Sequence, residues 1–432
     1  MATIERTRQG AIEKFGLESV PAELRKTKWF EYFIIQFSFS VNAGNVLLPA
    51  LAVTEGHLSI LQAFFSCLAG AVLAFFFVSY LSLPGARDGI PAQYFIRSIL
   101  GTKAARFLAS PIRSITSLYW FAVQTIGGTM MIIPLTERYF HVRPPFALLA
   151  AILSSIMILI IVIGFEAVKR ATKYFLPVLL LGQAVILYLY FTTDSASAAP
   201  VSSQGGSIPF GVMCLFASLV FVQYISGATA SADMTRYARS PKDGFAGMFA
   251  GNVCGFMMTA ALGAFSAAKF HEINPFISAA ALSSSGILTG IVLLSSILSM
   301  IAINLNNAYS GSFSLLNIFP ALGRLKSAFL FGAAGIAASM VPSLVSEAKL
   351  FIGWLGCLII PLCAVVVTDY LLIKQPVEKM AGFGDANKNT LIGIGFGMLV
   401  YLLIPAAFSP GFISFVLTSF VYFLLSAAFK KQ

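Results

Sequence analysis

Residues 37–53 read FSFSVNAGNVLLPALAV, an apolar run that is interrupted in its middle. The interruption consists of Asn42, Ala43, Gly44 and Asn45. A polar, glycine-containing break in a long apolar segment predicts unwound backbone at membrane depth, where only surrounding protein or a water-filled cavity can satisfy it. The stretch therefore predicts a broken helix beside a cavity. The alternative interpretation is a small-residue face that lets two helices pack closely.

A second long apolar run, residues 208–231, is interrupted in the same way. Its centre contains Gln223, Tyr224, Ser226 and Gly227. Counted from the N-terminus, the two interrupted runs are the first and the sixth. These places are equivalent if ten helices form two halves of five, which is the pattern of an inverted-repeat transporter whose site lies between broken helices.

The rest of the 432-residue chain is equally apolar. Hydrophobic residues make up 58% of the sequence, charged residues 10%, and the mean hydropathy is +0.86. Soluble domains carry about 25% charged residues, so this composition excludes a set of soluble domains and a nucleic-acid partner. It predicts an all-α polytopic membrane protein with roughly twelve spans. We place them at 30–53, 58–83, 107–133, 146–164, 172–192, 208–231, 244–268, 286–310, 327–343, 349–372, 390–407 and 411–428.

The predicted spans divide the chain into four parts. These are an N-terminal tail at 1–29, a first repeat of spans 1–5 at 30–192, a second repeat of spans 6–10 at 208–372, and two accessory C-terminal helices at 390–428. The connecting segments are too short to hold folded domains. Residues 84–106 form a longer connection, which predicts an interfacial helix or a re-entrant piece. The end of the eighth span is left open between Asn304 and Pro320.

Positive charge predicts the orientation of the spans. With both termini on one side, 24 of the 28 Lys and Arg residues, Arg113 among them, fall on that side. The other side keeps Arg138, Arg143, Lys269 and Lys349. Basic residues collect on the cytoplasmic side of membrane proteins, so we expect cytoplasmic termini in the cell membrane. The first 28 residues lack a short apolar region ending in a cleavage site, so no removable signal peptide is expected.

Spans 3 and 8 carry polar side chains where a site between broken helices needs them. Trp120 and Gln124 are four residues apart and share one helix face. The indole offers a flat face for stacking, and the carboxamide offers two donors and an acceptor, so together they suit a planar heterocycle. The eighth span contains Asn304, Asn306 and Asn307. For any one of these three, a structural bond to a neighbouring helix is the alternative.

Catalytic patterns are missing from the sequence. It contains no HExxH, no nucleotide-phosphate Gly-Lys loop, no Ser/His/Asp constellation and no paired intramembrane carboxylates, which argues against an enzyme or an ATP-driven pump. The five cysteines have no CxxC spacing and predict neither a disulfide framework nor a zinc site. Asp233, beside Arg236 and Arg239, is expected to form a structural ion pair at a helix end, and a role in gating is the alternative.

At this point the sequence resembles a known family, the nucleobase:cation symporters of the purine/cytosine permease type, which includes cytosine, purine, hydantoin and allantoin carriers. The most specific stretch is FVQYISGATASADMTRYARSPKDG at 221–244. YWFAVQ at 119–124 and FIGWLGCLIIPLCAVVVTDYLL at 351–372 are also similar to the family. The resemblance covers nearly the whole chain and leaves the individual substrate open.

The resemblance implies a LeuT-like five-plus-five inverted-repeat core with two additional C-terminal helices, alternating access and a small nucleobase-like substrate. It also implies that Trp120 and Tyr224 sandwich the base. The side chains that it assigns to the edge of the base are Gln124, Gln223, Ser226, Asn304 and Asn306. No cofactor is expected, the lipid bilayer is the surrounding partner, and the carrier is expected to be a monomer.

One departure from the family bears on the coupling ion. Sodium-coupled members resemble one another in placing Ser or Thr hydroxyls just before the Asn of span 8. Here Ala302 and Ile303 precede Asn304, and neither side chain offers an oxygen. Ser299, one turn earlier, remains as the coupling-ion candidate. We therefore expect proton coupling, or facilitated uptake over a weakened sodium site, and no confident metal site.

Two other functions are kept open. A carrier of amino acids or amines on the same architecture would use unwound helix ends for a carboxylate, and would leave Trp120 and Gln124 without a clear role. A membrane channel belongs to a different class, and would conduct in planar bilayers without counterflow.

Overall fold

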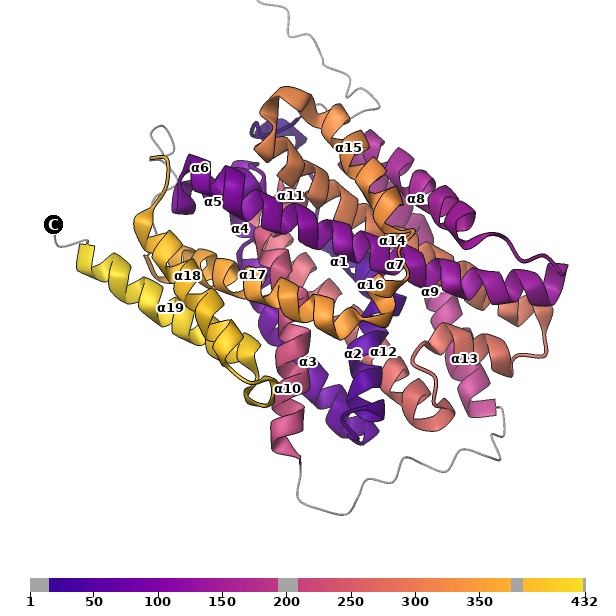
Figure 1. The fold of residues 1–432 in the computed structure, drawn as a ribbon. Coiled ribbons are helices and arrows are strands. Elements are labelled where there is room, and N and C mark those ends of the chain that lie inside the picture. Colours follow the sequence, from indigo (N-terminus) through magenta and orange to yellow (C-terminus); the bar gives the residue numbers. More distant parts are fainter. Residues whose placement is uncertain (1–14, 193–208, 374–383, 430–432) are drawn as a thin grey trace, which may run out of the picture.

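The computed structural model describes residues 15–192, 209–373 and 384–429, and within these ranges the chain is helical without a strand (Figure 1). Residues 1–14 of the predicted N-terminal tail, about half of it, lie outside these ranges. The N-terminal part contains α1 (Trp29–Ser40), α2 (Ala43–Thr54), α3 (Ile60–Tyr80), α4 (Leu83–Asp88), α5 (Ala92–Leu100), α6 (Thr102–Ala104), α7 (Ser110–Phe140), α8 (Phe146–Ile163) and α9 (Phe165–Thr192).

The C-terminal part repeats this succession of long helices with short interruptions. It contains α10 (Phe210–Ile225), η3 (Ser226–Thr229), α11 (Ser231–Thr235), α12 (Pro241–Phe270), α13 (Pro275–Leu282), α14 (Gly286–Ile318), α15 (Gly323–Ala338), α16 (Ser343–Ser346), α17 (Ala348–Thr368), α18 (Lys388–Leu403) and α19 (Pro410–Phe429). A π-helical turn, η5 (Asp369–Ile373), continues α17.

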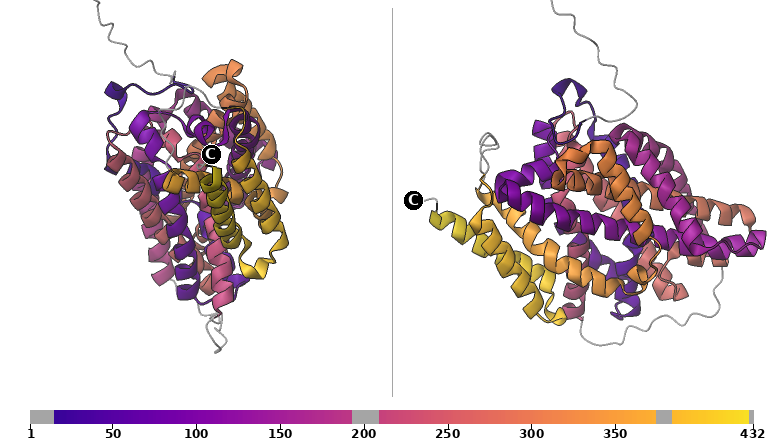
Figure 2. Two further views of the ribbon diagram at one scale, coloured as in Figure 1. Left: turned by 90° about the vertical axis from the view of Figure 1, so that its left-hand side faces the viewer. Right: turned by 45° about the horizontal axis from the view of Figure 1, so that its top comes forward.

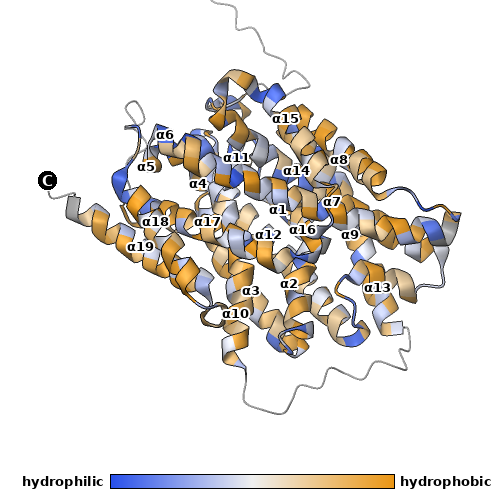
Figure 3. Cartoon of the chain, viewed as in Figure 1, coloured by the Kyte–Doolittle hydropathy of each residue, from blue (hydrophilic) through white to orange (hydrophobic). Residues whose placement is uncertain are grey.

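The described helices have the length and composition of membrane spans. Ten are long and apolar enough to cross a bilayer, and the bent pair α1–α2 makes an eleventh. The twelfth predicted span corresponds to α19, and the eleventh to α18, which is apolar but shorter. Apolar residues cover the outer faces of the helices (Figure 3), and many large ones are exposed there, for example Phe65, Leu159 and Leu402. An apolar exterior of this extent fits a lipid-facing surface.

The packing of the helices follows the two-fold exchange expected of an inverted repeat. The first span, α1, packs most extensively on α12, the seventh span, while α10, the sixth span, packs on α3, the second. The third and eighth spans, α7 and α14, pack on each other at the centre. The two C-terminal helices, α18 and α19, lie at the edge of the bundle against α17 (Figures 1 and 2). The expected five-plus-five core with two added helices is confirmed.

Both predicted helix breaks are present. The chain bends by 51° between α1 and α2, where Asn42 is extended and its side chain caps α2 by accepting from the Asn45 backbone N–H. A side-chain cap is favourable here because the first N–H groups of a helix lack partners. The sixth span changes from α10 to the 3-10 turn η3 at Ser226 and resumes as the short helix α11.

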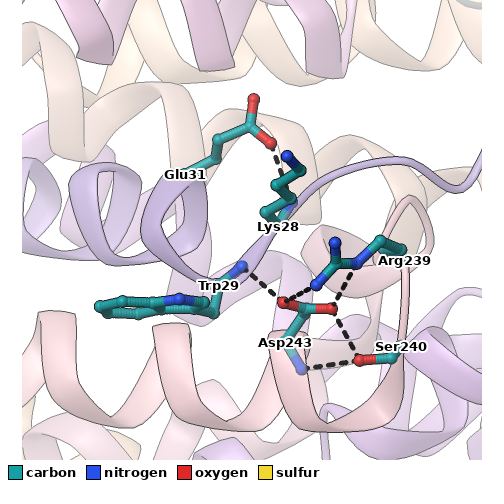
Figure 4. Close-up of polar contacts among 6 residues, drawn as sticks. All are labelled: Lys28, Trp29, Glu31, Arg239, Ser240 and Asp243. Atoms are coloured by element: carbon teal, nitrogen blue, oxygen red, sulfur yellow. Dashed lines mark hydrogen bonds and ion pairs between the residues drawn. The ribbon is translucent and has the colours of Figure 1, made fainter.

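The two N-terminal ends of α1 and α12 are joined by one carboxylate (Figure 4). Asp243 accepts hydrogen bonds from the Trp29 backbone N–H at 2.9 Å, from Arg239 Nε at 3.1 Å and from Ser240 Oγ at 2.7 Å. The Ser240 hydroxyl in turn accepts from the Asp243 N–H, which caps α12. The N-terminal half of the broken first span, α1, is therefore fixed to α12, the seventh span.

The structure refines the predicted elements in several places. The end of the eighth span, left open between Asn304 and Pro320, falls at Ile318, and the helix is continuous to that point with its polar residues buried in the bundle. The 84–106 connection forms α4, α5 and α6, and α5 is buried in the protein along Phe95, Ile96 and Leu100. The sequence reading also missed α13, whose first turn is capped by Asn274.

Candidate functional site

A cavity lies between the two helix breaks. The space in it that the centre of a water molecule can occupy is about 110 Å³. That is roughly ten times the space that one buried water needs, so a small ring with its substituents fits. Polar side chains from eight helical elements line it. They are Gln36 and Ser40 of α1, Asn45 of α2, Arg113 and Gln124 of α7, Gln223 of α10, Ser226 of η3, Ser231 of α11, Asn252 of α12, and Asn306 and Asn307 of α14.

The first break holds Gln124 in one orientation. Asn42 Nδ2 donates to the Phe39 carbonyl at 2.6 Å, and Asn42 Oδ1 accepts from the Asn45 N–H at 3.0 Å. These backbone partners fix which atom of the Asn42 amide is the oxygen. Gln124 Nε2 then donates to Asn42 Oδ1 at 2.8 Å, which leaves Gln124 Oε1 buried without a partner. The wall of the cavity thus carries an unsatisfied hydrogen-bond acceptor.

A second amide pair joins the two breaks. Asn45 Nδ2 donates to the Ser40 carbonyl at 2.7 Å, so Asn45 Oδ1 is the atom that accepts from Gln223 Nε2 at 3.3 Å. The Gln223 oxygen is therefore a second acceptor at the cavity. Ser226 Oγ donates to the Gln223 carbonyl at 3.3 Å and stabilises the turn at the break.

Gly44 permits the close contact between the first break and α7. A Cβ at this position would lie 2.1 Å from Gln124 Nε2. A side chain of any size would push the carboxamide away from Asn42.

The two aromatic side chains that were predicted to stack on a ring, Trp120 of α7 and Tyr224 of α10, both line the cavity, together with Phe39 and Phe75. Trp120 packs edge-to-face on Tyr119, with 5.1 Å between the ring centroids. Tyr224 packs on Phe75 at 4.6 Å and on Phe256 at 5.3 Å, and its hydroxyl is buried without a partner. Neighbouring rings hold the Trp120 and Tyr224 rings in place at the cavity. Aromatic rings held in this way can stack on a planar ligand.

The asparagines of α14 divide between two surroundings. Asn304 does not line the cavity, because its Nδ2 donates to the Phe121 carbonyl at 3.0 Å and to Thr125 Oγ1 at 3.1 Å on α7. Asn306 and Asn307 do line it, and Asn307 Nδ2 donates to Asn304 Oδ1 at 3.1 Å. The structure therefore brings Asn306 to the cavity and places Asn304 in the contact between helices.

The other predicted positions are also located. Gly227 lines the cavity, and Ala43 begins α2. Ser299 is fully buried outside the cavity lining, and its hydroxyl donates to the Ser296 carbonyl at 2.7 Å. Within the described ranges no group of three or more His, Cys, Asp or Glu residues could hold a metal ion.

Arg113 is placed differently from the prediction. It was counted among the charges outside the membrane, but it lies on α7, is 4% exposed and lines the cavity. Its Nη1 donates to the Ser226 carbonyl at 3.2 Å, and its Nε has no hydrogen-bond partner. The Ser226 carbonyl lies at the helix break and accepts from this guanidinium and from Thr229 Oγ1, the latter at 2.9 Å. The only sequence signal was the spacing of seven residues, two helical turns, before Trp120.

Asp233 also differs from the prediction. The carboxylate is fully buried, and its Oδ1 accepts from the Ala92 N–H at 2.8 Å at the start of α5. Its Oδ2 has no hydrogen-bond partner, and the expected ion pair is not formed. Asp233 instead caps α5, because the free N–H groups of a helix N-terminus attract a negative charge.

Among the lining residues that sequence reasoning missed are two amides, Asn252 and Gln36. Asn252 donates to the Met248 carbonyl at 2.9 Å and accepts from Ser40 Oγ at 3.2 Å, and Gln36 lines the cavity one turn before Ser40. Both are amides inside predicted spans, which was the available signal.

Comparisons with known proteins bear on the family and the fold of this chain. Residues 19–400 match the family described as permease for cytosine/purines, uracil, thiamine and allantoin. Mhp1, a nucleobase-cation-symport-1 family transporter, in a closed conformation with bromovinylhydantoin bound, superimposes with a TM-score of 0.80 and 16% identity, over 96% of this chain and 94% of the other. The inward-facing conformation of Mhp1 gives 0.75 and 17%, over 96% of each chain.

A more distant similarity extends to a sodium-coupled sialic acid symporter in a substrate-bound, outward-open state. Its TM-score is 0.63 at 13% identity, over 94% of this chain and 91% of the other. At these identities the solved structures show a shared fold. Among curated proteins no match was found.

Proposed function

The chain belongs to the family of permeases for cytosine/purines, uracil, thiamine and allantoin, and from that premise we propose that it takes up a nucleobase or related planar N-heterocycle by alternating access. It is an integral membrane transporter and not an enzyme. The observation that carries the proposed substrate class is the Gln124 carboxamide, whose oxygen is held at the cavity by Asn42.

The chemistry of the cavity supports a ring with N–H donors. Gln124 Oε1 and Gln223 Oε1 are acceptors, and they complement the ring N–H and exocyclic amino groups of nucleobases and hydantoins. Trp120 and Tyr224 offer flat faces at the same cavity. A buried acceptor that stays empty costs about 1–3 kcal/mol, so a ligand that fills it is selected over one that does not. An amino acid or amine could donate to these oxygens, but it would leave the flat faces of Trp120 and Tyr224 without a planar partner.

The contacts of the broken first span indicate which helices move together. Both halves of the first span pack on α12: α1 is also bonded to it through Asp243, and α2 lies along it. At the break, the Gln124–Asn42 hydrogen bond joins this span to α7. The first span and α12 therefore move as one group relative to α7. This supports alternating access, in which one helix group moves against the other around the bound ring.

Several finer features belong to the same proposal. Uptake is coupled to protons, because Ala302 and Ile303 supply no side-chain oxygen and sodium needs several oxygen ligands. The carrier is a monomer in the cell membrane. Its termini are cytoplasmic, as supported by the distribution of Lys and Arg.

A binding screen tests the proposed substrate class. Purified protein is heated with cytosine, uracil, adenine, guanine, hypoxanthine, hydantoin or allantoin, and hits are then measured as counterflow uptake in proteoliposomes. At least one compound should raise the unfolding temperature and exchange across the membrane. If none does while the protein remains folded, the proposed substrate class is wrong.

A further inference from the structure

We infer that the substrate of this carrier is an anionic N-heterocycle, a ring bearing a carboxylate, and that Arg113 binds its negative edge. This inference rests on the proposed function and names the substrate class more narrowly. It starts from a buried charge that the uptake of a neutral base does not use.

Arg113 is the cation among the described lining residues of the cavity. A guanidinium has five N–H donors, yet the hydrogen bond found for Arg113 is the one from Nη1 to the Ser226 carbonyl. Its Nε is buried without a partner. A charged group that is 96% buried with an unfilled donor is unfavourable unless something compensates it, and Arg113 is a lining residue of the cavity.

Asp233 does not replace such a ligand. The two charges are near enough to interact electrostatically, but they do not form an ion pair. The carboxylate is used at Ala92, where it accepts the backbone N–H, and it does not line the cavity. Cys363, also near Arg113, donates its thiol to the Ile225 carbonyl and supplies no acceptor of comparable strength.

The spacing along α7 places the charge at the opposite end of a ring from Gln124. Arg113, Trp120 and Gln124 lie at positions i, i+7 and i+11, which share one helix face. Seven residues span about 10 Å of helix axis, and the side chains of Arg113, Trp120 and Gln124 all line the same cavity. A ring stacked on Trp120 can therefore donate its N–H edge to Gln124 Oε1 and direct an anionic oxygen toward Arg113. Guanidinium and carboxylate groups have matching planar geometry for such a contact.

Orotate and uracil form a matched pair of probes, because they share one ring and differ by a carboxylate. Dissociation constants are measured for both with wild-type protein, Arg113→Gln and Arg113→Lys. Wild type should bind orotate about tenfold to a hundredfold more tightly than uracil, the range for a hydrogen bond to a charged group. Arg113→Gln should bring this ratio close to one, and Arg113→Lys should keep part of it.

Arg106→Gln is the matched control. Arg106 also donates to a backbone carbonyl, that of Ile318 at 2.6 Å, but it does not line the cavity. The orotate to uracil ratio should stay unchanged in this variant. Thermal unfolding identifies any variant that fails to fold, and the Lys variant keeps the charge if the Gln variant is lost.

The possible failures are distinguishable. If Arg113→Gln weakens both probes equally, Arg113 only holds the Ser226 carbonyl and the inference is wrong. Uracil binding without any orotate binding would overturn the inference and leave the proposed function standing. If no heterocycle binds to folded protein, the proposed function fails and this inference fails with it.

Discussion

Gln124 Nε2 donates to Asn42 Oδ1 at 2.8 Å across 82 residues of sequence, and this bond joins the break of the first span to the third span. Asn42 has a second task at the same atom, since its Oδ1 also accepts the Asn45 N–H that begins α2. The geometry of the helix break and the orientation of the Gln124 side chain therefore both depend on the Asn42 carboxamide.

Asn42→Ala should lower both stability and affinity. The variant removes the cap of α2, worth about 1–2 kcal/mol, and releases Gln124 from its fixed orientation. Thermal unfolding and ligand binding measure the two effects. Asn387→Ala is the control, because Asn387 caps α18 outside the cavity, and it should cost stability alone. Equal losses of affinity in the two variants would show that Asn42 has no specific role in ligand binding.

Gly44→Ala should weaken ligand binding by roughly tenfold or more, because the new Cβ would lie 2.1 Å from Gln124 Nε2 and displace it. Gly127→Ala on α7 is the matched control, since a Cβ there meets nothing within 4 Å. Binding isotherms of the two purified variants give the comparison. An unchanged affinity in Gly44→Ala would show that the position of Gln124 does not matter for binding.

Asn304→Ala and Asn306→Ala should have different effects although they are two residues apart. Asn304 links α14 to α7 through two hydrogen bonds, so its loss should lower the free energy of unfolding by about 1–3 kcal/mol. Asn306 lines the cavity, so its loss should reduce affinity more than stability. Paired unfolding and binding measurements would contradict this division if Asn304→Ala kept full stability and lost binding.

Uptake should persist when external sodium is replaced by choline, because Ala302 and Ile303 offer no ligand oxygen. Transport of labelled substrate into proteoliposomes measures it, with an imposed pH gradient as the second variable. Uptake should rise when the outside is more acidic and fall when a protonophore collapses the gradient. A steep dependence on sodium concentration would refute the coupling assignment.

The helix breaks could be predicted because Asn and Gly interrupt otherwise continuous apolar runs, and this pattern has few other causes at membrane depth. The pairing of Trp120 with Gln124 followed from their spacing on one helix. By contrast, residues two apart face directions about 200° apart on a helix, so which of Asn304 and Asn306 meets the cavity depends on a rotation that only packing sets.

Arg113 shows a different limit of the sequence. An arginine near the end of a span is assigned by default to the membrane surface, because burying its charge is unfavourable without partners. Its partner here is the Ser226 carbonyl, which lies at the break of the sixth span. That relation joins residues 113 positions apart, and no local pattern reveals it.

The account depends most on the claim that the Gln124 oxygen binds an N–H of a planar heterocycle. Its most direct test is the dissociation constant of the best ligand from the screen, measured for wild type, Gln124→Ala and Gln183→Ala. Gln183, on α9, is equally buried but lies outside the cavity. Gln124→Ala should weaken binding by about tenfold to a hundredfold, and Gln183→Ala should not. Equal affinity in wild type and a folded Gln124→Ala variant would contradict the account.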